Sequence, residues 1–193
     1  MMVELRGDVV LVGEAPDAIP AEPGLYAWWS LPGALPGISG PLHPDGEREL
    51  VYVGIARSGP SSGATLRSRV VGNHIGGTTG QSTLRRSLAS LLYEQEGWRS
   101  RFTDRPLLMA EDEARLNDWM QEHLAVSWAV HEQPWTVEAA VIAQLTPPLN
   151  QSANSAHPLY RHVRQARQRW RQAAREAAPD PPGTEPQQGG TDE

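Results

Sequence analysis

The strongest strand-like runs come early in this chain and helical patterns dominate the rest, and this order most constrains the fold. Residues 24–31 (GLYAWWSL) and 49–56 (ELVYVGIA) are rich in aromatic and β-branched residues, a composition typical of buried strands. Between them, residues 32–48 (PGALPGISGPLHPDGER) predict a long surface loop, because Pro and Gly interrupt regular structure. Weaker strand-like runs occur at residues 9–12, 105–110 and 124–130.

Helical periodicity dominates the remainder. Apolar residues recur at spacings of three and four in segments 65–75, 82–96, 111–124, 136–145 and 160–178. Ser82 and Thr136 stand where capping residues are expected, and Pro147 with Pro148 should end the fourth helix. The order predicts an α+β domain with a small, central, mostly antiparallel three-stranded sheet flanked by helices, followed by a C-terminal Arg-rich helix.

Composition suggests the domain limits. We expect an N-terminal extension over 1–21, the main domain over 22–157, a basic helix over 158–178 and a disordered tail over 179–193, because the tail has no large apolar residue. No apolar run approaches the ~20 residues that span a bilayer. The first eight residues also lack the apolar segment of a signal peptide, so we expect a cytoplasmic protein with no membrane partner.

The residue types present exclude several chemistries. With no cysteine, the chain can form no disulfide, thiol nucleophile or Cys-based zinc site. All 17 basic residues are arginine, so Schiff-base and P-loop lysine chemistry are also excluded. Every fixed side-chain cation is therefore a guanidinium, which is suited to bidentate phosphate contacts.

Charge is distributed unevenly along the chain. The formal net charge is -6, yet residues 57–105 hold eight arginines against three acids, and residues 158–178 hold six against one, each a balance of +5. Residues 106–140 hold one arginine against seven acids, a balance of -6. A basic face that binds nucleic acid is therefore compatible with the acidic total.

Four short motifs follow one another in a distinctive order. They are GLY ending at Tyr26, YVG beginning at Tyr52, LRSR ending at Arg69, and a helical Glu138 followed by PPLN ending at Asn150. In this order they resemble the GIY-YIG endonuclease family over roughly residues 22–151. The long connection between the two tyrosines is more similar to the restriction-enzyme branch, in which insertions touch DNA.

The resemblance implies a metal-dependent endonuclease that hydrolyses DNA phosphodiester bonds in restriction or repair. Glu138 would hold Mg²⁺ or Mn²⁺, since one carboxylate suffices for an ion that keeps several waters. Tyr26 would position or deprotonate the attacking water, and Tyr52 would orient the water or the phosphate. The family's Leu-x-x-Arg spacing selects Arg69, rather than Arg67, to bind the scissile phosphate.

Two further residues have supporting roles in this interpretation. His74 is a candidate for proton transfer or phosphate contact, and Asn150 would hold local backbone and support the site indirectly. Taken singly, each candidate also has an ordinary explanation: strand aromatics, a solvated helix arginine, an acid in the first turn of a helix. The alternative function is a non-catalytic module on the same fold that binds nucleic acid or a protein partner, and a homodimer is compatible with either.

The last helix carries two stripes. Its apolar stripe, Leu159, Val163, Ala166 and Trp170, is spaced to pack against the domain. Its arginine stripe would then face phosphates, and consists of Arg164, Arg167, Arg171 and Arg175. A solvated Arg-rich helix with no ligand is the alternative.

Overall fold

The computed structural model describes residues 4–152 and 154–177 and is built around one antiparallel sheet. Its strand order is β1-β6-β2-β3, with β1 (Val10–Leu11), β2 (Gly24–Ser30), β3 (Glu49–Ala56) and β6 (Leu124–Val130). The α+β class with a central antiparallel sheet is confirmed. The sheet has four strands rather than the expected three, because β1 pairs with the outer side of β6. The predicted tail, 179–193, lies outside the described residues.

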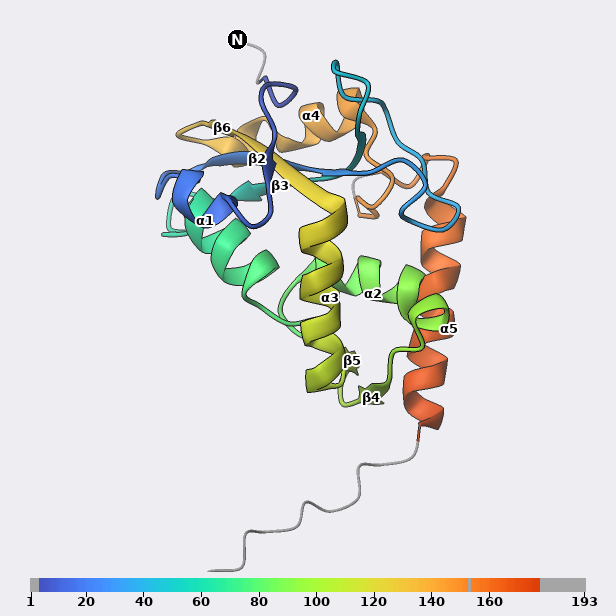
Figure 1. The fold of residues 1–193 in the computed structure, drawn as a ribbon. Helices are drawn as coiled ribbons and strands as arrows, with labels where there is room; N and C mark the ends of the chain where they lie inside the picture. Colours follow the sequence, from blue (N-terminus) through green and yellow to red (C-terminus); the bar gives the residue numbers. More distant parts are fainter. Residues whose placement is uncertain (1–3, 153, 178–193) are drawn as a thin grey trace, which may run out of the picture.

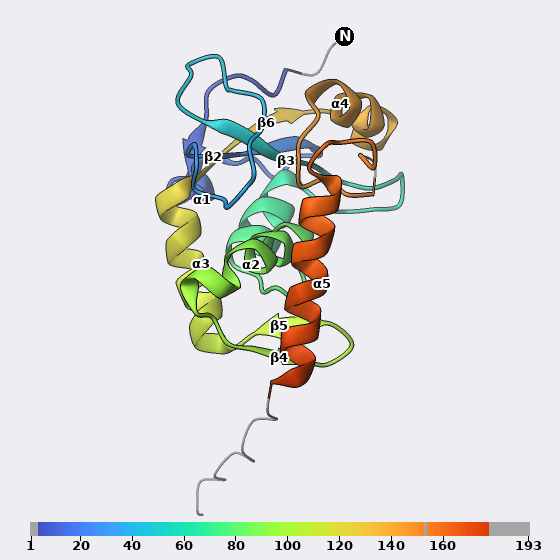
Figure 2. The same ribbon diagram turned by 90° about the vertical axis from the view of Figure 1, so that its right-hand side faces the viewer.

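Helices cover both faces of the sheet. One face carries α4 (Glu138–Leu145), and below the other lie a π-helix, η1 (Ser68–Ile75), and three α-helices (Figures 1 and 2). These are α2 (Thr83–Glu96), α3 (Ala110–His123) and α5 (Tyr160–Glu176). Two short turns, α1 (Ala15–Ala18) and the 3₁₀ helix η2 (Pro134–Thr136), complete the connections. None of the described helices is long and apolar enough to cross a membrane.

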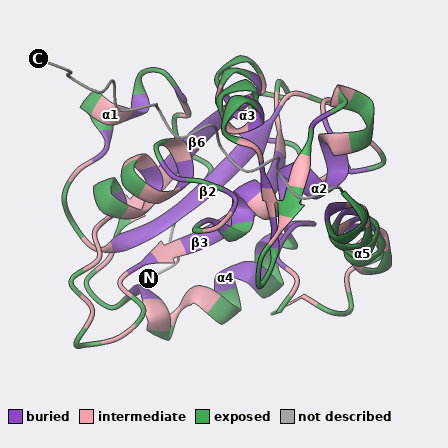
Figure 3. Ribbon diagram, turned by 90° about the horizontal axis from the view of Figure 1, so that it is seen from below, coloured by how far each residue is buried: buried purple, intermediate pink, exposed green. Residues whose placement is uncertain are grey.

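Strand β2 runs through the core and is buried on both faces (Figure 3). Because side chains alternate along a strand, Tyr26 and Trp28 pack toward the helices of the lower layer. Leu25 and Trp29 point the other way and pack with Val141 and other residues of α4. This two-sided burial explains why the run GLYAWWSL is apolar throughout instead of alternating with polar residues.

The strand register brings the two motif tyrosines together. Tyr26 of β2 lies opposite Gly54 of β3, and Trp28 lies opposite Tyr52. Tyr26 and Tyr52 are therefore diagonal neighbours on the same face of the sheet, within reach of each other's rings. The pairing turns two separate sequence motifs into one local cluster.

Two helix starts differ in their caps. Ser82 caps α2, since its Oγ accepts a hydrogen bond from the backbone N–H of Arg85 at 3.1 Å. The expectation that Thr136 caps the next helix is wrong. Thr136 belongs to η2, its Oγ1 donates to the Gln133 carbonyl at 2.7 Å, and α4 begins at Glu138 without a side-chain cap. The Thr136 hydroxyl is bonded within the 3₁₀ turn, whereas the sequence spacing predicted that it would cap α4.

The segment expected as a helix over 65–75 is a π-helix over most of its length. Leu66, Val70 and His74 nonetheless share the buried side, because a spacing of four suits the wider turn as well as the α-helix. Single π-type turns occur frequently at functional sites.

The last helix is docked as its apolar stripe predicts. Val163, Ala166 and Trp170 are buried, and the Trp170 indole N–H donates to Ser100 Oγ at 2.6 Å. Ser100 begins the small hairpin of β4 (Ser100–Phe102) and β5 (Pro106–Leu108), which packs against α5 at the end of the molecule farthest from the sheet (Figure 1). The weak run at 105–110 is thus a strand of this hairpin, and not of the main sheet.

Candidate active site

A pocket of about 260 Å³ opens at β3, the edge strand of the main sheet. Tyr52 of β3, Glu138 at the start of α4 and Arg167 of α5 all line it. Because β3 lies at the edge, side chains from both helical layers can meet beside it. Of the six residues that the sequence singles out, Tyr52, Glu138 and Asn150 line the pocket directly.

Gly54 makes room for the ring of Tyr26. A Cβ placed on Gly54 would lie 2.5 Å from both Cζ and the hydroxyl oxygen of Tyr26. A carbon contact needs about 3.5 Å, so no larger residue fits without displacing the phenol. The glycine of the YVG motif is therefore explained by its neighbour across the strands.

The Tyr26 hydroxyl begins a short buried chain of hydrogen bonds. It lies 2.7 Å from His74 Nε2, and His74 Nδ1 lies 2.7 Å from Ser82 Oγ. Ser82 is in turn fixed as the cap of α2. Tyr26 and Ser82 are buried, and His74 is only 1% exposed. The position of the phenol is thus fixed by two helices as well as by the sheet.

Burial keeps both partners of this pair neutral. It raises the pKa of Tyr26 well above its usual value, and the nearby Tyr52 raises it further, while the Arg69 guanidinium opposes the shift. Burial, with the charges of Arg69 and Arg85, lowers the pKa of His74 to about 3. At neutral pH a phenol therefore faces an uncharged imidazole.

Arg69, and not Arg67, belongs to this cluster. The positive charge of Arg69 acts on Tyr26, Tyr52 and Glu138, lowering the pKa of each against the effect of burial. Arg67 is exposed, and its Nη1 donates to the Ile19 carbonyl at 3.3 Å. The two arginines are two positions apart, so the helix points them in different directions.

Glu138 presents a carboxylate that the described structure leaves unpaired. Partial burial raises its pKa, and only Arg69 counters this electrostatically. Within residues 4–152 and 154–177, no group of three or more acidic or histidine side chains is placed to hold a metal ion. Any cation bound at Glu138 would complete its shell with water and substrate oxygens, as Mg²⁺ commonly does.

Asn150 closes the open edge of β3. Its Oδ1 accepts from the Val53 N–H at 2.9 Å, and its Nδ2 donates to the Val53 carbonyl at 2.7 Å. The Leu149 N–H adds a bond to the Val51 carbonyl at 3.0 Å. These bonds satisfy backbone groups that an edge strand would otherwise expose, and they hold the strand segment that carries Tyr52.

Sequence reasoning missed two contributions to the site. Arg167 lines the pocket from the last helix, although its place on the arginine stripe predicted only a general phosphate contact. Ser82 orients His74 in addition to capping α2, and its hydroxyl has no sequence signal beyond the cap. Neighbouring Arg85 is instead structural, because it is fully buried and pairs with Glu113 at 2.7 Å.

Comparison with known proteins identifies the domain. The family model for the GIY-YIG catalytic domain matches residues 24–169, well over half of the chain. No curated protein and no solved structure matches the chain. The matched range ends within α5. It contains every member of the cluster around Tyr52, which consists of Tyr26, Tyr52, Arg69, His74, Glu138, Asn150 and Arg167.

Proposed function

Because the chain belongs to the GIY-YIG family, a family of nucleases, we propose that it is a divalent-metal-dependent endonuclease that hydrolyses DNA phosphodiester bonds. The observation that carries the proposal is the pocket beside Tyr52, which is lined by the unpaired carboxylate of Glu138 and by Arg167. Arg69 and the buried Tyr26 lie within electrostatic reach of Tyr52, and Tyr26 is hydrogen-bonded to His74. Restriction or repair of DNA is the process in which such an activity would serve.

Glu138 suits a hard cation. Its carboxylate is half-buried, has no competing hydrogen-bond donor in the described structure and faces the pocket. A bound Mg²⁺ or Mn²⁺ would supply Lewis acidity and offset the negative charge that develops on the phosphate. The protein's part is to hold one carboxylate there and leave the remaining positions to water and DNA.

Arg69 and Tyr52 suit the scissile phosphate. A guanidinium binds two phosphate oxygens at once, and its charge stabilises the transition state more strongly in a partly buried site than in water. Tyr52 lies within electrostatic reach of Arg69 and Glu138. Its hydroxyl would orient either the phosphate or the attacking water between them.

Tyr26 and His74 suit the positioning of the attacking water. As the water oxygen attacks phosphorus, the bond to the leaving sugar oxygen breaks, the water loses a proton to solvent and the leaving oxygen takes one up. With hydrogen on Nδ1, neutral His74 accepts a hydrogen bond from the Tyr26 hydroxyl through Nε2, so the phenol oxygen keeps a lone pair that can accept a hydrogen bond from the water and orient it. Both ring nitrogens of His74 are engaged, which favours this role over direct phosphate contact.

Plasmid nicking tests the proposal. Purified protein should convert supercoiled plasmid to nicked or linear DNA with Mg²⁺ or Mn²⁺, and excess chelator should abolish the reaction. The Tyr26→Phe variant, which loses only the hydroxyl, should bind DNA normally and nick far more slowly. A folded protein that binds DNA but nicks under neither ion would instead be the non-catalytic binding module.

A further inference from the structure

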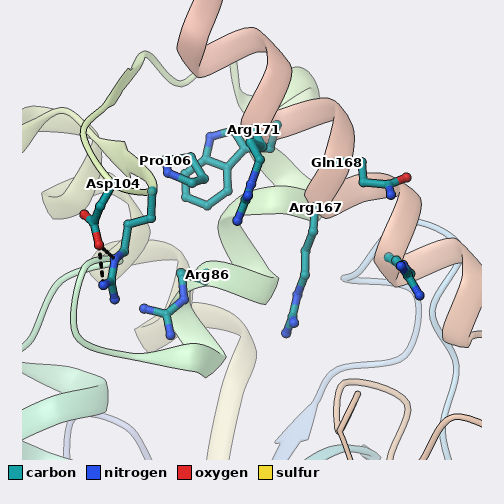
Figure 4. Close-up of a pocket in the computed structure, with 9 residues that line it drawn as sticks. Arg86, Asp104, Pro106, Arg167, Gln168 and Arg171 are labelled. Atoms are coloured by element: carbon teal, nitrogen blue, oxygen red, sulfur yellow. Dashed lines mark hydrogen bonds and ion pairs between the residues drawn. The ribbon is translucent and has the colours of Figure 1, made fainter.

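A second, larger hollow of about 640 Å³ adjoins the catalytic pocket, and we call it the arginine groove. It lies between α2, the β4–β5 hairpin and α5, and Figure 4 shows Arg86 of α2 and Arg167 and Arg171 of α5 around it. The charged residues that line it are Arg86, Asp104, Arg105, Arg164, Arg167 and Arg171. Five arginines from three elements, separated by up to 85 positions in sequence, thus face one space.

Most of this positive charge is not neutralised by the protein. Asp104 pairs with Arg105, from which it accepts two hydrogen bonds. Among the described residues, no carboxylate lies within 4.0 Å of a guanidinium nitrogen of the other four arginines. Five positive charges and one negative charge leave the groove at +4. Arrays of like charge oppose folding, so the gathering of these arginines in one hollow points to an anionic ligand.

The cost of burying these like charges together is clearest at Arg167 and Arg86. The pKa of Arg167 is lowered by burial and by the charge of Arg86, and that of Arg86 by burial and by the charge of Arg105. Arg167 donates to Ser87 Oγ at 2.5 Å, but its buried Nε has no partner in the described structure. A phosphate oxygen would satisfy that donor and relieve the repulsion between the two guanidinium groups.

The groove lies next to the catalytic pocket. Arg167 lines both hollows, and Arg86 and Arg167 both act electrostatically on Tyr52. A chain of phosphates that enters the pocket can therefore extend directly along the groove. A small anion would need only one or two of the five arginines, whereas a polyanion can use all of them.

We propose that the arginine groove binds the sugar-phosphate backbone of the DNA strand next to the scissile phosphate. Arg167 and Arg86 hold the phosphate nearest the catalytic pocket, and Arg164, Arg171 and Arg105 contact the backbone farther away. This deepens the proposed nuclease function, on which it rests, by assigning a substrate-binding surface outside the catalytic cluster.

The groove offers no aromatic platform on which a base could stack. Trp170 is the aromatic residue that lines it, but Trp170 is only 1% exposed and its N–H is bonded to Ser100. No stacking surface for a base is thus available from this side chain. Guanidinium contacts to phosphates carry no sequence information, so binding through the groove is the same for every sequence.

The test compares two double variants of α5. Arg164→Gln with Arg171→Gln removes two groove arginines, whereas Arg161→Gln with Arg169→Gln removes two that do not line it. All four side chains are exposed, so both variants should keep the fold, which a thermal melt would verify. The net charge changes equally in the two proteins, so long-range attraction to DNA is matched.

Binding is measured by fluorescence anisotropy with labelled duplexes of unrelated sequence, in chelator, over a range of salt concentrations. Each phosphate contact adds about 0.9 to the slope of log affinity against log salt, so the groove variant should have a slope smaller by about 2. Over a fourfold rise in salt, wild type should therefore lose roughly tenfold more affinity than the groove variant. The control variant should keep a slope close to wild type, and all sequences should behave alike.

Each outcome bears on one claim only. Equal slopes for the two double variants would overturn the groove assignment, even if the protein nicks DNA. A loss that differs between sequences would overturn backbone recognition. A protein that never nicks, yet shows the reduced slope only in the groove variant, would retain the groove and refute the proposed nuclease function instead.

Discussion

The contact between Gly54 and Tyr26 gives the sharpest structural prediction, for Gly54→Ala. The added methyl group would lie 2.5 Å from the Tyr26 ring and hydroxyl, about 1 Å inside a normal contact. Strand β3 cannot yield easily, because β2 pairs with one side of it and Asn150 holds the other. The phenol must move, and overpacking of this kind costs about 1–3 kcal/mol.

The displacement should affect activity more than stability. The Tyr26 hydroxyl makes a 2.7 Å hydrogen bond with His74, which a 1 Å movement would break. We expect the melting temperature to fall by roughly 2–4 °C for each kcal/mol lost, and the nicking rate to fall by about 100-fold. DNA affinity in chelator should be unchanged, because Tyr26 is buried and is not expected to contact the DNA when it binds without metal.

Gly72→Ala is the matched control for this prediction. Gly72 is exposed on η1, and a Cβ there would meet no atom within 4 Å. Alanine should leave nicking intact and stabilise the helix by about 0.5–1 kcal/mol. If Gly54→Ala melted and nicked like wild type, the role assigned to the glycine and to the fixed position of Tyr26 would be refuted.

Two further predictions concern the arginine choice and the buried histidine. Arg69→Ala should lose most nicking activity while Arg67→Ala loses little, since only Arg69 acts on the cluster around Tyr52; equal losses in a side-by-side nicking assay would contradict the assignment. His74 should make stability depend on pH, because the unfolded chain binds a proton near pH 6.5 that the native imidazole does not accept until about pH 3. Stability should therefore decrease as the pH falls through this window, by about 1.4 kcal/mol per pH unit from this group. Urea unfolding at several pH values gives the change in unfolding free energy per pH unit, which should be smaller by that amount in His74→Gln. An identical pH dependence in the two proteins would show that His74 is not buried in its neutral form.

Local patterns predicted the main elements of the fold. The runs that contain Tyr26 and Tyr52 are strands, and the apolar stripe of the last helix is buried through Val163 and Trp170. Each of these depends on residues near one another in sequence, whose side-chain period shows directly. The start of α4 was predicted wrongly, because a 3₁₀ turn and a helical turn offer a Thr hydroxyl at the same spacing.

The candidate site was only partly predictable, for a physical reason. Motif order indicated Tyr26, Arg69 and Glu138, but not the hydrogen bond of Tyr26 with His74, which joins residues 48 positions apart. The place of Arg167 in the pocket depends on how α5 docks, and no local pattern encodes that angle. Contacts made by folding several elements together become visible only in three dimensions.

The central claim is that Glu138 holds the catalytic cation, and Glu138→Gln tests it most directly. The substitution keeps size and helix propensity but removes the charge that attracts a hard cation. One preparation should be used for three measurements: nicking in Mg²⁺, DNA affinity in chelator, and the melting temperature. We predict that nicking collapses, affinity holds or rises slightly because a carboxylate no longer repels the phosphate, and the melting temperature is maintained. Near-normal nicking by Glu138→Gln would contradict the metal assignment, and lost nicking with a lowered melting temperature would make Glu138 a stabiliser of the α4 start instead.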